Sequence, residues 1–151
     1  MKNIRQAKTK DLSRLAEIIV FNNRINFFPI FKDEEFSFGT VNVIDWVKTF
    51  LENDAELLKR TYVYDDGLIR GLVIIKGEEV EKLYVEPLFQ SRGVGGKLLE
   101  YAVNERGASF LWALEKNYRG IEFYRRHGFL PNGEKELEEG TAEYLLKLVR
   151  G

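Results

Sequence analysis

The sequence of 151 residues contains no cysteine and only one histidine, His127. Without cysteine the chain has no disulfide, no thiolate metal ligand and no cysteine nucleophile. A single histidine argues against a zinc site and against a Ser-His-Asp triad. No metal site is therefore expected.

The sequence also lacks a long apolar run and a strong excess of charge of one sign. No stretch approaches the ~20 apolar residues of a membrane-spanning helix, and the segment 1–6 has no apolar signal region. The net charge of −1 argues against a general affinity for nucleic acid or for anionic membranes. We therefore expect a cytoplasmic protein that binds neither nucleic acid nor membrane.

The hydrophobic fraction of 44% and the charged fraction of 31% are typical of a globular protein. The length suits one domain over residues 1–151, and no repeat or Pro/Gly/Ser-rich linker divides it. Helices are expected after Thr9 or Asp11, which would cap the apolar positions 12, 15, 18 and 19, and over 43–51, 93–106 and 117–127. Strands are expected over 3–8, 57–64, 68–75, 80–85, 109–114 and 142–149, with a hairpin turn at 65–67. Hairpins followed by helical crossovers predict a mixed α/β fold.

Two segments are expected to form loops. The segment 27–39 is aromatic, contains Pro29 and shows no clean period. The connection 131–140 carries an acidic run over 134–139, which we interpret as a solvated loop that could attract a cationic substrate.

The most informative segment is a glycine-rich turn between a strand and a helix, with Gly93, Gly95 and Gly96. Glycines let the backbone approach a ligand closely, and the start of a helix offers unpaired N–H groups and a positive dipole end. This combination predicts a site for phosphate or pyrophosphate, with Arg92 and Lys97 adding positive charge.

Three phosphate-binding patterns can be compared with these residues. A P-loop requires Ser or Thr where Leu98 stands and Gly where Ser91 stands, and the dinucleotide pattern requires Gly in place of Leu98. The third pattern, Gln/Arg-x-x-Gly-x-Gly/Ala, is matched in full by residues 90–95.

At these residues the chain resembles the GCN5-related N-acetyltransferase (GNAT) family. The family's pyrophosphate motif follows a strand that ends in Val-x-Pro, as 85–87 do here. A second block, 117–129, is similar to the family's Asn-x-x-Ala/Gly-x-x-Phe-Tyr-x-x-x-Gly-Phe segment. The resemblance covers residues 57–129 well and the first ~55 residues loosely.

The resemblance implies an acyl-CoA N-acyltransferase fold, with a mixed, mostly antiparallel sheet of six or seven strands and about four helices. It places acetyl-CoA in a V-shaped opening between the strands 80–85 and 109–114. Backbone groups of the first strand would hold the pantetheine arm, and the glycine turn would hold the pyrophosphate. The implied cofactor-binding residues are Leu83, Tyr84, Val85, Gln90, Ser91, Arg92, Gly93, Val94, Gly95, Gly96, Lys97, Asn117 and Tyr124.

The implied reaction is direct attack of a primary amine on the thioester of acetyl-CoA in a ternary complex. An ammonium with a pKa near ~10.4 must first lose a proton, and Glu81 is the candidate base. Glu115, a backbone carbonyl or water are the alternatives, and Glu81 would otherwise be part of a solvated acidic edge with Glu79. Tyr124 is the candidate proton donor to the departing thiolate, and would otherwise be a core aromatic residue.

Other residues have two interpretations each. Asn117 caps a helix, contacts the cofactor, or does both, while His127 is interpreted mainly as a cation favoured at a helix end. Aromatic residues near the expected acceptor site could line a pocket, form a lid over the core or make a dimer contact. They are Phe27, Phe28, Phe31, Phe36, Phe38 and Trp46.

Two other functions stay open on the sequence alone. The chain could bind acetyl-CoA or an amine as a sensor without turnover, or it could transfer another acyl group or use an acceptor other than an amine. The sequence does not identify the acceptor, and it leaves a homodimer open.

Overall fold

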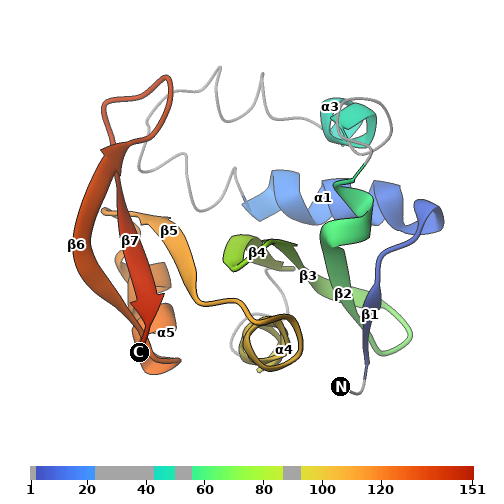
Figure 1. Cartoon of the computed structure of the whole chain (residues 1–151). Coiled ribbons are helices and arrows are strands. Elements are labelled where there is room, and N and C mark those ends of the chain that lie inside the picture. Colours follow the sequence, from blue (N-terminus) through green and yellow to red (C-terminus); the bar gives the residue numbers. More distant parts are fainter. Residues whose placement is uncertain (1–2, 23–42, 50–55, 87–92) are drawn as a thin grey trace.

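The computed structural model describes residues 3–22, 43–49, 56–86 and 93–151, and a seven-stranded sheet forms its centre (Figure 1). The strand order is β1-β2-β3-β4-β5-β7-β6. The strands are β1 (Ile4–Gln6), β2 (Thr61–Asp65), β3 (Ile69–Lys76), β4 (Glu79–Val85), β5 (Phe110–Leu114), β6 (Phe129–Leu137) and β7 (Tyr144–Arg150). Every pair is antiparallel except β4 with β5, which confirms the predicted mixed, mostly antiparallel sheet.

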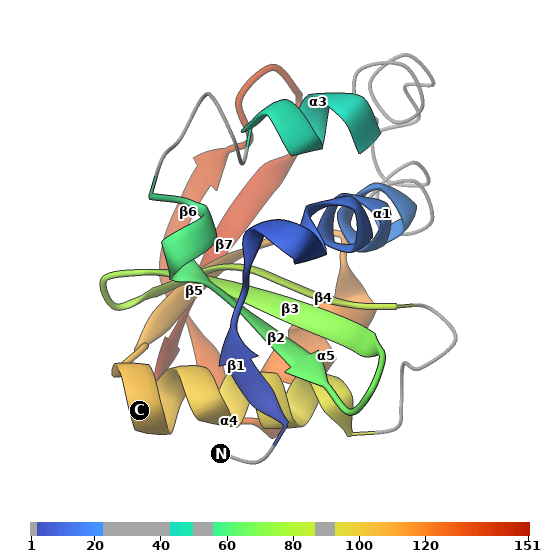
Figure 2. The same cartoon turned by 90° about the vertical axis from the view of Figure 1, so that its right-hand side faces the viewer.

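Helices cover both faces of the sheet (Figure 2). Within the described residues they are α1 (Leu12–Asn22), α3 (Val43–Lys48), α4 (Val94–Arg106) and α5 (Tyr118–Arg126), with 3-10 turns η1 (Thr9–Asp11) and η5 (Leu58–Arg60). The apolar positions predicted for α1 are buried in a core cluster with β3 on one face. A second cluster on the other face contains α4 and side chains of α5. None of the helices described is long and apolar enough to cross a membrane.

The sheet divides between its two parallel strands. β4 and β5 pair only where Glu79 lies opposite Phe110 and Val80 lies opposite Leu111. Beyond these pairs β5 stays with β7 as far as Leu114. The two strands therefore part toward their carboxyl ends, as the family resemblance implied for this pair.

A β-bulge lies where the strands begin to part. On β3, Ile75 faces Val80 and Ile74 faces Lys82, so Glu81 is an extra residue of β4. The bulge interrupts the regular alternation of side chains along β4. Bulges bend a strand and redirect a side chain, often next to active sites.

The strand predicted over 57–64 begins only at Thr61. The preceding residues form the turn η5, in which the Arg60 N–H donates to the carbonyls of Glu56 and Leu57. The Thr61 hydroxyl also donates to the Leu57 carbonyl, at 2.8 Å. The prediction failed because these local bonds and the burial of Leu57 hold a turn in a segment of strand-like composition.

The loop predicted over 131–140 is largely wrong, because β6 extends to Leu137 and pairs with β7. Apart from Phe129, every residue of β6 is exposed. Edge strands tolerate proline, glycine and charged residues because one side of their backbone needs no partner. The composition of 131–137 therefore indicated solvent exposure, which an edge strand shares with a loop. The loop expected over 27–39 lies outside the described residues, as do all the aromatic residues named above except Trp46.

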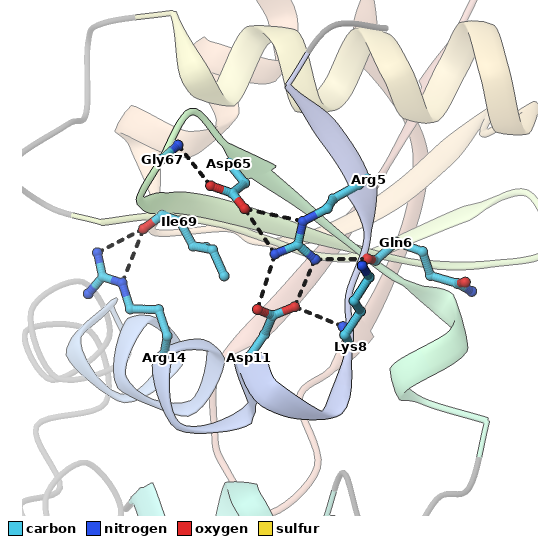
Figure 3. A network of polar contacts seen from close by, with 8 residues as sticks. All are labelled: Arg5, Gln6, Lys8, Asp11, Arg14, Asp65, Gly67 and Ile69. Carbon is cyan, nitrogen blue, oxygen red and sulfur yellow. Dashed lines mark hydrogen bonds and ion pairs between the residues drawn. The ribbon is translucent and has the colours of Figure 1, made fainter.

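The first strand and the start of α1 are held to β2 by charged side chains (Figure 3). The Arg5 guanidinium bonds the Asp11 carboxylate at 2.8 Å and 3.1 Å and the Asp65 carboxylate at 3.0 Å and 3.2 Å. Asp11 also accepts from the Lys8 N–H, so it fixes the turn η1. Arg14, on α1, donates to the Ile69 carbonyl of β3. These contacts fix α1 against the sheet on one side of the opening.

Candidate active site

A cavity of about 640 Å³ opens where β4 and β5 part. Its wall combines the end of β4, the first turn of α4 and one face of α5. The lining residues are Asn22, Leu83, Val85, Gly93, Gly95, Gly96, Asn117, Arg119, Gly120, Glu122, Phe123, Tyr124, Arg126 and His127. Seven of the residues implied for cofactor binding are thus brought together.

The first turn of α4 forms one end of the cavity. Gly93, with φ of +85°, is the N-cap, and its carbonyl accepts from the Lys97 N–H at 3.0 Å. The N–H groups of the three residues between them have no partner within the helix, and they carry its positive dipole end. A Cβ on Gly95 would lie 3.3 Å from Phe123 and 3.4 Å from Val85, so glycine allows α4 to approach both.

The edge of β4 offers backbone groups to the cavity. The Glu86 N–H donates to the Arg70 carbonyl at 2.9 Å, which makes Val85 and Gly71 a pair without hydrogen bonds between them. The backbone groups of Leu83 and Val85 therefore point away from β3, toward the side from which β5 has parted. An extended ligand there would lie along β4 as an added strand.

The opposite wall is one face of α5. The Asn117 side chain accepts from the Gly120 N–H at 3.1 Å, which confirms its predicted capping role. Gly120, Phe123 and His127 follow at helical spacing and line the cavity with it. The His127 imidazole packs on Phe123, with ring centroids 4.7 Å apart.

Tyr124 lies in the same wall, against Phe123 and Phe129. Burial among its neighbours, and to a smaller extent the Tyr84 phenol, raises the pKa of Tyr124 above its ordinary value. The phenol is consequently protonated at neutral pH.

Two arginines, Arg119 and Arg126, line the cavity, with Glu122 as the opposing charge. Arg126 and His127 also border a second cavity of about 470 Å³ between α4 and the end of β7. An anionic ligand at the start of α4 would thus meet cationic side chains from α5.

The remaining predicted residues lie elsewhere. Val94 and Tyr84 are buried in the core, and Lys97 is exposed with its ammonium 5.6 Å from the Tyr64 ring centroid. Gln90, Ser91 and Arg92 lie outside the described residues.

The candidate bases do not line the cavity either. The Glu81 carboxylate pairs with Arg60 at 3.1 Å, and Glu115 pairs with Lys135 at 2.9 Å. Burial and the neighbouring Glu81 raise the pKa of Glu79. In the part of the chain that the structure describes, no three His, Asp or Glu side chains are grouped to hold a metal ion.

Sequence reasoning assigned no ligand role to several lining residues. The periodicity of α5 was sufficient to find Gly120 and Phe123, because both share a face with Asn117 and Tyr124. Asn22 was recognisable only as a polar residue that continues the apolar stripe of α1. Its proximity to Val85 depends on the packing of α1 against β4.

A sheet that parts between two parallel strands, with a glycine-capped helix at the opening, defines the acyl-CoA N-acyltransferase fold. The acetyltransferase (GNAT) domain family matches residues 58–131. YjaB from Escherichia coli, in its apo form, has a TM-score of 0.75 at 20% identity, covering 97% of this chain and 95% of that one. PaiA N-acetyltransferase from Thermoplasma acidophilum, in complex with coenzyme A, has a TM-score of 0.65 at 20% identity, covering 97% of both. These two likenesses show the fold.

Curated relatives match over shorter stretches. The peptidyl-lysine N-acetyltransferase YjaB of Salmonella typhimurium is 28% identical over 80 residues, which are 52% of this chain and 55% of that protein. An uncharacterized N-acetyltransferase of Methanocaldococcus jannaschii, MJ1207, is 40% identical over 68 residues, 41% of this chain and 28% of that protein. The chain thus spans about half or less of the length of these relatives. Residues 58–131 thus belong to the acetyltransferase (GNAT) domain family, and the described chain has the fold of its solved structures.

Proposed function

We propose that this protein is an N-acetyltransferase that transfers the acetyl group of acetyl-CoA to a primary amine by direct attack in a ternary complex. The observation that carries the proposal is the cavity in which the parted strands, the glycine-capped start of α4 and Tyr124 meet. The coenzyme A bound to the PaiA N-acetyltransferase of the same fold supports the use of an acyl-CoA.

The proposed position of acetyl-CoA follows from the chemistry of the cavity wall. The pantetheine amides would lie along Leu83 and Val85, where backbone groups of β4 face the opening. The pyrophosphate would meet the N–H groups at the start of α4, with Arg119 and Arg126 nearby. A volume of about 640 Å³ lies within the usual range of small-molecule sites.

In the proposed reaction two side chains move protons. Glu81, which pairs with Arg60 at the bulge of β4, accepts a proton from the substrate ammonium through water, because its carboxylate does not line the cavity itself. The free amine attacks the thioester carbon, and the attacking nitrogen then loses its surplus proton to solvent. The carbon–sulfur bond breaks as the tetrahedral intermediate collapses to the amide. Tyr124 donates its proton to the departing thiolate and is reprotonated from solvent.

A primary amine is the proposed acceptor class because the relative named above is a peptidyl-lysine N-acetyltransferase, and a lysine side chain ends in such a group. The acetyl preference, a cytoplasmic location and a homodimer are further parts of this proposal.

Calorimetric titration of the purified protein with acetyl-CoA tests the cofactor, with NADH and ATP as controls. We expect binding of acetyl-CoA and weak or undetectable binding of the controls, because only acetyl-CoA combines a pyrophosphate with a pantetheine arm. Absence of acetyl-CoA binding would contradict the proposal.

A thiol-release assay then tests turnover with a panel of amines, including lysine peptides, polyamines and amino acids. We expect CoA release to depend on an amine. Selective binding of acetyl-CoA without release of CoA across the panel would identify a sensor instead. Faster release of CoA from a longer acyl-CoA than from acetyl-CoA would contradict the proposed preference for acetyl.

A further inference from the structure

Asn22 is a buried polar residue at the cavity that belongs to neither sequence block of the family resemblance. It is the last residue of α1, lies outside the family match and is 2% exposed. The positions before it on the same face, Leu15, Ile18 and Ile19, belong to the apolar core. A buried amide on an apolar face must make hydrogen bonds to offset its loss of water.

The Asn22 amide joins the end of α1 to the end of β4. Its Nδ2 donates to the Ile18 carbonyl at 2.9 Å, within its own helix, and to the Val85 carbonyl at 3.0 Å. The second bond links residues 63 positions apart in the sequence.

The bond to Val85 is made at the edge of β4 that faces the opening. The register of β3 and β4 directs the backbone groups of Val85 away from β3, and its carbonyl accepts from the Asn22 amide at 3.0 Å. Val85 is also the last residue of β4. Asn22 therefore fixes the orientation of a peptide group that borders the cavity.

We infer that Asn22 is a positioning residue for the pantetheine arm of the acyl-CoA: its side-chain amide holds the Val85 peptide group, and through it the ligand-facing edge of β4. The inference rests on the proposed function, since it concerns the same cavity. An edge held before binding lowers the cost of ordering it around the ligand. Asn22 acts at the end of β4 beside α4, away from the reacting atoms. It therefore affects the affinity for acetyl-CoA more than kcat.

Two variants remove the donor in different ways. Asn22→Leu replaces the amide with an apolar group of similar size, and Asn22→Asp keeps the shape but substitutes a carboxylate that, when ionised, cannot donate to a carbonyl. Thr61→Val is the matched control, because Thr61 is fully buried and also donates to a backbone carbonyl, that of Leu57, away from the cavity.

The Kd for acetyl-CoA, the kcat at saturating acetyl-CoA and the Tm are measured for each protein. We expect the Asn22 variants to weaken acetyl-CoA binding about five- to tenfold, the effect of one lost hydrogen bond, and to keep kcat within about twofold. Thr61→Val is expected to lower Tm while leaving the Kd unchanged. This pattern separates positioning from a purely structural role.

Each other outcome overturns a stated claim. If the wild type binds acetyl-CoA and both Asn22 variants bind it equally well, the positioning role is wrong and the proposed function stands. The same holds if Thr61→Val weakens binding as much, because the effect would then follow from stability alone. If the wild type does not bind acetyl-CoA, the proposed function fails and this inference fails with it.

Discussion

Tyr124 and Tyr118 belong to the same short helix but have contrasting surroundings. Tyr124 lines the cavity and has a raised pKa, whereas Tyr118 is 75% exposed and does not line it. A role as proton donor requires the hydroxyl of Tyr124, while packing requires only its ring. Removal of the hydroxyl alone therefore separates the two interpretations left open by the sequence.

We expect Tyr124→Phe to lower kcat about 10²-fold or more, within the range of general acid catalysis, and to leave the Kd for acetyl-CoA within about twofold. Tyr118→Phe, on the same helix, is expected to behave as the wild type. Steady-state rates from thiol release and Kd values from titration give both quantities. A wild-type kcat in Tyr124→Phe would remove this residue from the mechanism.

Gly93 is required for its backbone conformation more than for the space around it. Its φ of +85° is left-handed, although nothing lies within 4 Å of a Cβ placed there. We expect Gly93→Val to cost about 1–3 kcal/mol of stability by strain and to weaken acetyl-CoA binding by displacing the N–H groups at the start of α4.

Gly107 provides the control for this prediction because it caps the other end of α4 with φ of +73° and open space around it. Gly107→Val should lower Tm to a similar extent and leave the Kd for acetyl-CoA unchanged. Thermal unfolding and titration of both variants make the comparison. Equal Kd values for the two variants would place the pyrophosphate elsewhere.

The bulge in β4 determines the surroundings of the two glutamates. It makes Glu81 the extra residue of the strand and allows its pairing with Arg60, while Glu79 keeps a regular position opposite Lys76. We expect Glu81→Gln to lower kcat about 10²-fold without changing the Kd for acetyl-CoA, and Glu79→Gln to have a small effect.

A pH–rate profile completes this comparison. The pKa of Glu79 is raised, so a Glu79 base would become deprotonated at higher pH, and the rate would rise with pH through that pKa. Loss of this rise in Glu79→Gln, with an active Glu81→Gln, would assign the base to Glu79. Arg60→Gln is the additional control, since it breaks the ion pair and leaves the Glu81 carboxylate.

The junction of β1, η1 and β2 is expected to make the fold sensitive to acid. The hydrogen bond from Arg5 is the main cause that lowers the pKa of Asp11. The pKa of Asp65 is lowered mainly by its hydrogen bond from the Gly67 N–H, and to a smaller extent by Arg5. A carboxylate whose folded pKa is lowered stabilises the fold above its unfolded pKa of ~3.9, and this contribution is lost as the pH falls through the folded value. The unfolding free energy should therefore decrease below about pH 4.

At pH 7, Asp11→Asn is expected to lower the unfolding free energy by about 2 kcal/mol, a value between those of exposed and buried ion pairs. This corresponds to a decrease of roughly 4–8 °C in Tm. The difference from the wild type should shrink as the pH falls below ~4, where the wild type loses the same charge. Asp66→Asn is the control, since Asp66 is exposed and bonds Arg70 four residues away. Thermal unfolding between pH 3 and pH 7 tests this, and a constant difference would contradict it.

One part of the sheet contains β1, β2, β3 and β4, and the other contains β5, β7 and β6. The two parts share few backbone pairs across the opening. A ligand that contacts both β4 and α5 would join them. At a concentration 100 times its Kd, acetyl-CoA should raise the unfolding free energy by about 2.7 kcal/mol, which is roughly 5–11 °C in Tm. Differential scanning fluorimetry measures this, and an equal shift with ATP would contradict selective binding.

Much of the fold could be predicted because its informative features are local in the chain. The glycine turn before α4, the cap at Asn117 and the face shared by Gly120, Phe123 and Tyr124 depend on spacings within one turn or helix. The strand β6 was missed because burial is the usual indicator of a strand, and an exposed edge strand lacks it. The turn over Leu58–Arg60 was missed because its hydrogen bonds are not encoded by hydrophobic periodicity.

The amino-acid sequence alone was sufficient for the family resemblance, the order of most elements and the position of the glycine turn before α4. These depend on residue type and short-range spacing, which backbone sterics and helix geometry convert directly into structure. The tertiary structure was needed to locate the bulge at Glu81, the pairing of that carboxylate with Arg60 and the bond from Asn22 to Val85. Each of these depends on how separate elements pack and in which register they pair, because contacts between residues distant in the chain arise only when the core forms.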